Sequence, residues 1–225
     1  MPTGLDALDH ALASGGLPRG RLTEVTGATG KLTLMRRVVE AAVARGDCVA
    51  YVDASRTLAP RDWAHLGHLD VVSIIRPADA AKAAWCADVL LRSAAFALVV
   101  LDSAPPISRA VAVRLTGLAR ESNAAFVTVG VNGATRLGGA VRLRVNRRRQ
   151  RLTIVIEKGA GVGRNGRLQN VVEVGCANGV ARRLCSYPEV PDRRAAARAA
   201  SGRSGKGRRA ATPSYDGGGG VLQYR

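Results

Sequence analysis

The stretch EVTGATGKLTL, residues 24–34, joins an apolar, strand-like segment to a long helical pattern. The strand-like segment covers residues 21–26, and apolar residues recur at helical spacing over residues 31–45. A glycine-rich turn between a strand and a helix is where a phosphate-binding loop lies, and such a loop ends in Gly-Lys, as Gly30 and Lys31 do here. This stretch therefore predicts an α/β fold with a candidate anion site at its first turn.

The turn departs from the full phosphate-loop pattern, which is GxxxxGK followed by Ser or Thr. Two residues separate Gly27 from Gly30 where the pattern has four, and Leu32 occupies the position of the magnesium-binding hydroxyl. The longer loop wraps a phosphate with successive backbone N–H groups, so the shorter one is expected to form an incomplete nest. Lys31 keeps a positive charge at the start of a helix.

The rest of the sequence extends the α/β pattern. Strands are predicted at residues 48–54, 71–75, 97–102 and 125–131, and helices at residues 4–13, 60–66, 79–93 and 108–122. This alternation predicts a mostly parallel central sheet flanked by helices. Strand-like runs at residues 140–145, 152–157, 171–174 and 180–184 follow without helices between them, which predicts antiparallel strands at one edge.

The composition changes near the C-terminus. Residues 189–225 are basic and rich in small residues, and such a segment cannot bury enough apolar surface to fold. The expected domains are therefore a folded core over residues 1–188 and a flexible basic tail over residues 189–225.

The chain carries a formal net charge of +17, which favours an anionic partner such as nucleic acid, an acidic protein or an anionic membrane. Alternatively, the positive charge has no functional meaning and reflects a GC-rich genome, in which Arg and Ala codons are frequent. The cysteines show no zinc-like spacing, the N-terminus shows no signal peptide, and the longest nearly uncharged run is too short to span a bilayer. We expect a cytoplasmic protein, with association to the nucleoid as an option.

Three segments together resemble the RecA recombinase family: TGLDALDHALASGGLPRGRLTEVTG (residues 3–27), VDASRTLAP (52–60) and ALVVLDSAPP (97–106). The resemblance covers roughly residues 3–173 and implies a RecA-like core. It also implies that Asp102 is the remnant of the Walker B acid. The acid that orients the attacking water in RecA-like enzymes is replaced by Ser55. Because phosphoryl transfer depends on positioning and charge, these losses predict a protein without catalytic residues, cofactor or metal, and hence no enzyme.

A small RecA-like protein with a degenerate phosphate loop and a basic tail is similar to the ImuA family. This resemblance implies an accessory role in SOS mutagenesis and translesion DNA synthesis. The implied partner is ImuB, an inactive relative of Y-family polymerases. RecA itself is a second candidate partner, and an error-prone DNA polymerase would be reached indirectly. The chain begins almost directly at the core, so it is expected to retain the accepting surface of a RecA filament contact without the donating N-terminal arm. The alternatives are a DNA-dependent ATPase of the RecA class and an SOS cell-division inhibitor.

Arginines gather around one predicted hairpin: Arg136, Arg142, Arg144, Arg147, Arg148, Arg149 and Arg151. They suit contact with DNA phosphates or with an acidic partner, although a solvated edge that discourages strand aggregation is an equal alternative. Asp53 and Asp102 end predicted strands at the edge of the sheet where α/β proteins bind ligands. Trp63 and Trp85 are expected to pack between helices and sheet.

Overall fold

The computed structural model describes residues 1–59, 63, 66, 71–130, 137–162, 168 and 170–175. The chain divides into two units, Met1–Cys185 and Ser186–Arg225, and every described residue belongs to the first. The predicted tail, residues 189–225, the predicted strand at 180–184 and most of the predicted helix at 60–66 lie outside the described residues.

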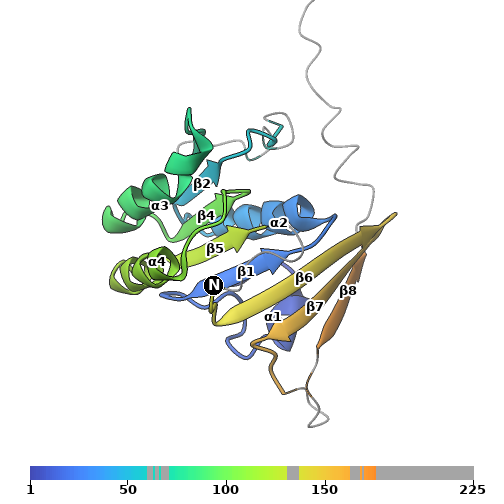
Figure 1. The fold of residues 1–225 in the computed structure, drawn as a ribbon. Coiled ribbons are helices and arrows are strands. Elements are labelled where there is room, and N and C mark those ends of the chain that lie inside the picture. The colour runs from blue at the N-terminus through green and yellow to red at the C-terminus, as the bar shows by residue number, and fades with distance from the viewer. Residues whose placement is uncertain are drawn as a thin grey trace, which may run out of the picture. The chain divides into compact units, whose positions relative to one another are not determined.

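The core of the first unit is an eight-stranded sheet with the order β3-β2-β4-β5-β1-β6-β7-β8 (Figure 1). The strands are β1 (Leu22–Thr26), β2 (Val49–Asp53), β3 (Val72–Ile75), β4 (Leu98–Asp102), β5 (Ala125–Val129), β6 (Val141–Arg148), β7 (Arg151–Lys158) and β8 (Val171–Gly175). All pairings from β3 through to β6 are parallel, and β7 and β8 are antiparallel additions at one edge. The predicted fold class is confirmed, with one adjustment: β6 pairs in parallel with β1 and only the strands after it are antiparallel.

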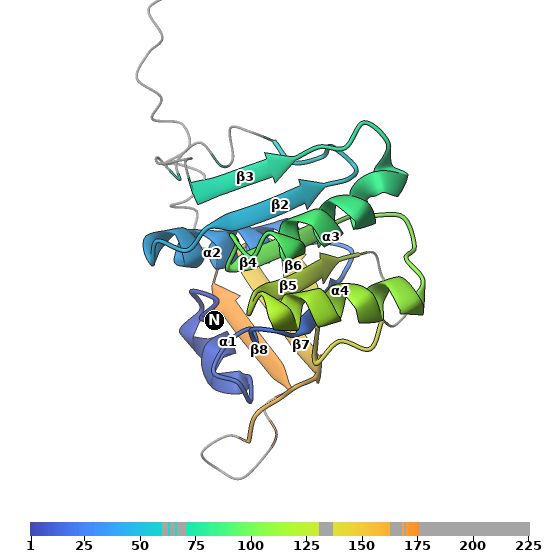
Figure 2. The same cartoon turned by 90° about the vertical axis from the view of Figure 1, so that its left-hand side faces the viewer.

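Helices cover both faces of this sheet. They are α1 (Asp6–Ala11), α2 (Lys31–Ala44), η4 (Ala80–Lys82), α3 (Ala83–Arg92) and α4 (Arg109–Glu121). Buried residues of α1 and α2 belong to one core cluster, and those of α3 and α4 belong to the other. Figure 2 shows α3 and α4 side by side on one face. No helix among the described residues is long and apolar enough to cross a membrane.

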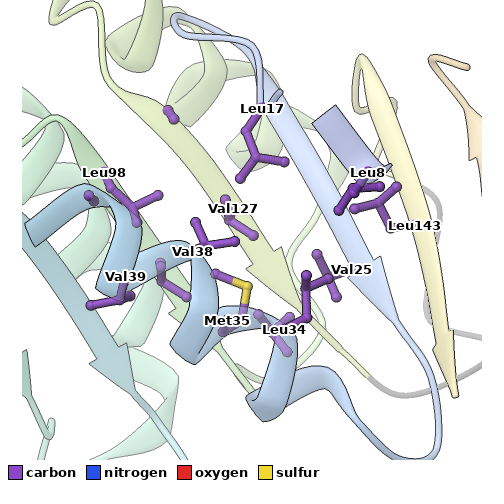
Figure 3. Packing of buried hydrophobic residues seen from close by; sticks show 14 of the residues in the cluster. Leu8, Leu17, Val25, Leu34, Met35, Val38, Val39, Leu98, Val127 and Leu143 are labelled. Carbon is purple, nitrogen blue, oxygen red and sulfur yellow. The ribbon is translucent and has the colours of Figure 1, made fainter. Parts of the chain in front are cut away.

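The central strands are apolar along their whole length because both of their faces are buried. In β2, Val49 and Tyr51 point into the cluster of α1 and α2, whereas Ala50 and Val52 point into the cluster of α3 and α4. Figure 3 shows Leu34, Met35 and Val38 of α2 packed over the sheet. This alternation fixes the strand register, because a shift by one residue would exchange the two faces.

The chain enters α2 through glycines that other residues could not replace. Gly30, the N-cap of α2, has φ +85°, and Gly27 has φ +143°. Backbone with such positive φ favours glycine. A Cβ on Gly27 would also overlap the carbonyl oxygen of Val145 in β6. The predicted strand–turn–helix is therefore present, and its glycines are required by the close approach of β6.

Candidate phosphate-loop site and arginine hairpin

The candidate site lies at the carboxyl edge of the parallel strands. The turn from Gly27 to Lys31 follows β1, while Asp53 ends β2 and Asp102 ends β4. Asp53 and Asp102 are opposite one another in the strand register. The structure thus brings the turn and both acids to one edge of the sheet, as the sequence predicts.

The contracted turn packs against β6. The Thr29 hydroxyl donates to Asn146 Oδ1 at 2.9 Å and accepts from the Arg147 backbone N–H at 3.0 Å. A Cβ on Gly30 would lie 2.6 Å from the Leu152 side chain. The turn is therefore fixed by the β6–β7 hairpin, and its one hydroxyl is already hydrogen-bonded.

Lys31 makes a contact within the protein. Its Nζ donates to the carbonyl oxygen of Gly130 at 2.7 Å. Gly130 directly follows β5, and its own N–H donates to the Val25 carbonyl at 2.9 Å. Leu32 is exposed beside Lys31 and offers no hydroxyl. The Lys31 ammonium group thus links the turn after β1 to the residue that follows β5, at the carboxyl edge of the sheet.

Asp102 is buried and accepts two hydroxyl hydrogen bonds. Tyr51 Oη donates to Asp102 Oδ2 at 2.7 Å, and Ser103 Oγ donates to Oδ1 at 2.9 Å. Burial raises the pKa of Asp102, while these hydrogen bonds act in the opposite direction. Burial also raises the pKa of Tyr51, with the Asp102 charge adding to the effect. The proton therefore stays on Tyr51, which acts as the donor.

Asp53 has a structural role. Its carboxylate accepts from the backbone N–H groups of Thr57 and Leu58, each at 3.1 Å, and pairs with Arg76 at 3.0 Å. Ser55, which the sequence resemblance places where RecA-like enzymes have their base, is exposed and lies 2.9 Å from Thr57, hydroxyl oxygen to hydroxyl oxygen. Asp53 thus holds the segment that leaves β2.

In the present arrangement, the two side chains that a nucleotide site would use here have partners within the protein. The Lys31 ammonium is engaged by Gly130, and the Asp102 carboxylate is engaged by Tyr51 and Ser103. In the described part of the chain, no group of three or more His, Cys, Asp or Glu side chains could hold a metal ion. Binding of a nucleotide here would require Lys31 to leave Gly130, and a metal at Asp102 would require Tyr51 to move.

The predicted arginine cluster divides into paired and unpaired members. Arg136 lies outside the described residues. Ion pairs hold Arg142 to Glu24 at 3.1 Å, Arg144 to Glu157 at 3.1 Å and Arg151 to Glu173 at 2.7 Å. Arg147 donates to the Thr33 hydroxyl at 3.3 Å. Arg148 and Arg149, at the exposed hairpin turn, form no ion pair with any described residue.

Glu24 is an anchoring residue that the sequence pattern did not reveal. It is buried in β1 and accepts from the Gly139 N–H at 2.7 Å, the Leu137 N–H at 3.1 Å and Arg142 at 3.1 Å. These bonds anchor the segment at residues 137–142, where the chain enters β6. The available signal was a single charged residue in a buried strand, because a buried carboxylate requires hydrogen-bonding or charged partners.

The two tryptophans have different environments. Trp63 is buried and packs edge-on against Tyr51, with ring centroids 5.3 Å apart, as expected. The prediction for Trp85 was wrong: its side chain is 65% exposed on the outer face of α3. The reason is that Ala83, Ala87 and Leu91 form the buried face of this helix and place Trp85 on the opposite side.

Comparison with known proteins connects this geometry to one family. The family model for the RecA N-terminal domain matches residues 1–118. Protein RecA of Bifidobacterium breve is 42% identical over 106 residues, which are 46% of this chain and 27% of that protein. Protein RecA of Streptomyces avermitilis is 43% identical over 106 residues, again 46% of this chain and 28% of that protein. The matched segment thus spans less than a third of these relatives.

A solved structure shares the fold over a larger part of the chain. The crystal structure of the RadB recombinase superposes with a TM-score of 0.60 and 23% sequence identity, covering 77% of this chain and 94% of that one. These comparisons contradict the prediction that the chain is no enzyme, because the relatives found are RecA proteins and the structural neighbour is a recombinase. Changes at single positions of the loop are therefore not sufficient grounds for concluding that activity is lost.

Proposed function

This chain belongs to the RecA N-terminal domain family, and from that membership we propose that it is an accessory protein of SOS mutagenesis and translesion DNA synthesis. It would act by binding a polymerase-like partner, the inactive Y-family relative ImuB, and RecA itself. The partner would supply an extended segment that adds to the open edge of the sheet at β3. A RecA-type core is suited to this role because its sheet can pair with the backbone of another chain.

The observation that carries the proposal is the edge position of β3. This strand pairs with β2 on one side, and no described strand pairs with its other side. The open side of an edge strand presents unpaired backbone groups, which another extended segment can satisfy. Ser73 is exposed, and Ile74 is 37% exposed in the same strand. The edge therefore offers both backbone hydrogen bonds and an apolar contact.

Arginines of the hairpin add a second contact in this proposal. Arg148 and Arg149 lie at the turn between β6 and β7, at the opposite side of the sheet from β3 in the strand order. A protein that docks at β3 would leave these guanidinium groups accessible. They suit DNA phosphates, which bind arginine mainly through charge. An acidic partner surface is the alternative ligand for the same two residues.

Binding assays with the full chain test the proposed docking edge. We expect saturable binding to RecA and to the ImuB-type partner, and loss of at least about tenfold in affinity for Ile74→Lys, because a charge would be buried at the contact. Val113→Lys, at an exposed apolar position of α4, serves as the matched control and should bind as the parent does. Equal binding by the parent and Ile74→Lys, or no binding to either partner, would refute the proposal.

A DNA-dependent ATPase of the RecA class is the second candidate. It is favoured by the presence of Lys31 and Asp102 at one edge of the sheet and by the RecA relatives. ATP hydrolysis measured with and without single-stranded DNA tests it, with Lys31→Ala as the control. Hydrolysis that depends on DNA and on Lys31 would support this candidate, and a rate unchanged by Lys31→Ala would exclude it.

A further inference from the structure

The outer face of α3 carries an apolar stripe that the proposed function does not use. Trp85 is 65% exposed and Val89, one turn later, is 46% exposed. Residues four apart in a helix lie on the same face, so these two side chains are neighbours. Tryptophan is rarely left so exposed without a partner, and exposed aromatic side chains are enriched at protein interfaces.

Arginines border this stripe and are held in place. Asp88 accepts a hydrogen bond from Arg92 Nε at 2.7 Å and forms an ion pair with Arg114 of α4, whose Nε lies 2.8 Å from Asp88 Oδ2. The Arg92 and Arg114 side chains nevertheless remain 57% and 61% exposed. Each guanidinium approaches Asp88 with its Nε, and among the described residues the terminal nitrogens of Arg92 and Arg114 form no hydrogen bond. The terminal nitrogens therefore keep donors available to a ligand, on side chains that Asp88 already holds.

The ion pair between Asp88 and Arg114 joins α3 to α4 and shows how the two helices are aligned. Both helices return from the carboxyl end of one parallel strand to the start of the next, so they run in the same direction, side by side in Figure 2. Asp88 of α3 lies opposite Arg114 of α4. Trp85 and Val111 each come three residues earlier in their helices, so they lie level with each other. Val111 is 37% exposed. Trp85 and Val111 therefore lie at one level of the helix pair, Val89 and Arg114 lie about one turn further on, and Arg92 follows Val89 along α3.

We propose that this surface, the Trp85 face (Trp85, Val89, Arg92, Val111 and Arg114), binds a segment of a partner protein that carries an apolar anchor beside acidic residues. The apolar anchor packs against Trp85, Val89 and Val111. The acidic residues meet the free donors of Arg92 and Arg114, where two guanidinium groups outweigh the single Asp88 carboxylate. The complementary charge and apolar content define the occupant.

Other occupants fit the Trp85 face less well. A nucleic acid would place phosphates next to the Asp88 carboxylate, and the neighbours of Trp85 on this face are valines, which do not form a stacking platform for bases. The tail of this chain, residues 189–225, is strongly basic and would be repelled by Arg92 and Arg114. The acidic, apolar segment of another protein remains the best match.

Selection from a random library of 16-residue peptides displayed on phage tests the proposal, with the full chain immobilised. We expect the enriched sequences to combine Leu, Phe or Trp with Asp or Glu. A fluorescein-labelled peptide of the consensus sequence should bind the parent chain in fluorescence anisotropy. Its affinity should fall about tenfold or more for Trp85→Ala, as for an interface hot spot, and also fall for Arg114→Gln.

Val113→Ala is the matched control, because Val113 is exposed on α4 but lies outside the Trp85 face. It should leave the peptide affinity unchanged, and circular dichroism should show that each variant is folded. No enriched sequence, enrichment without acidic residues, or equal binding to Trp85→Ala would overturn the proposal. So would a single-stranded oligonucleotide that displaces the peptide, or self-association that Trp85→Ala abolishes. The Ile74→Lys variant should bind the peptide normally, so this test is independent of the β3 edge.

Discussion

Tyr51 Oη donates a 2.7 Å hydrogen bond to Asp102 Oδ2, between the neighbouring strands β2 and β4. Both side chains are buried, at the edge where a RecA-type core would hold its metal-associated acid. The hydroxyl of Tyr51 thus occupies one side of this carboxylate. Lys31 is likewise engaged, by the carbonyl oxygen of Gly130, so both side chains of the candidate site have partners within the protein.

The first prediction concerns the pH dependence of stability. Burial raises the pKa of Asp102 above its usual value of 3.8, so its contribution favours folding at low pH and is lost as pH rises through the pKa of the folded state. We expect Asp102→Asn to lose stability relative to the parent as pH falls from 8 toward 4, because the parent binds a proton at Asp102 on folding in this range and the variant does not. Urea unfolding across this range measures it. If the free energies of unfolding of the parent and of Asp102→Asn change with pH in parallel, burial does not raise the pKa of Asp102.

The second prediction concerns Gly27. Gly27→Ala should lower the free energy of unfolding by about 3 kcal/mol or more, because it combines strained backbone with overlap on Val145. Gly117→Ala is the control, since Gly117 lies within α4 with open space around it, and it should be neutral or stabilise by about 0.5–1 kcal/mol. Equal stability of the two variants would contradict the close approach of β6.

The third prediction concerns Glu24. Glu24→Gln removes the charge that pairs with the largely buried Arg142, and it turns an amide donor toward backbone N–H groups. We expect a loss of about 2–4 kcal/mol in stability. Hydrogen exchange should be faster at the Gly139 amide in particular. Glu157→Gln, whose pair with Arg144 is more exposed, should cost less than about 1 kcal/mol. Unchanged protection of Gly139 would mean that Glu24 does not anchor this segment.

The fourth prediction concerns the arginine hairpin. Replacing both Arg148 and Arg149 by Gln should weaken binding to a single-stranded oligonucleotide and flatten its salt dependence, by roughly 0.7 in log–log slope for each phosphate that is no longer neutralised. Arg144→Gln and Arg151→Gln should have smaller effects, because ion pairs to Glu157 and Glu173 already engage those side chains. A salt slope that is unchanged in the double variant would assign DNA binding to another part of the chain.

Much of the fold follows from the sequence because its signals are local. The apolar runs of β2 and β4 predict strands buried on both faces, and Gly30 with Lys31 predicts the entry to α2. These features depend on neighbours in the chain. The pairing of β6 with β1 depends on contacts between distant segments, so its parallel direction could not be obtained from the same patterns.

The site was less predictable for the same reason. Sequence identified Lys31 and Asp102 but not their partners, because Gly130 and Tyr51 lie far away in the chain. It also treated the hairpin arginines as one set, whereas the structure separates Arg142, paired with buried Glu24, from Arg149, which has no ion pair among the described residues. Trp85 was misplaced because an exposed aromatic residue has no distinct periodicity, and only its neighbours on α3 define the buried face.

Site-specific photocrosslinking tests the central claim, partner docking at β3, most directly. A benzoylphenylalanine is introduced in place of Ile74 in the full chain, and in place of Val113 as the control, and each is irradiated with RecA and with the ImuB-type partner. The account predicts a crosslink from position 74 to an extended segment of one of these partners and none from position 113. No crosslink from position 74, or equal yields from both positions, would contradict it.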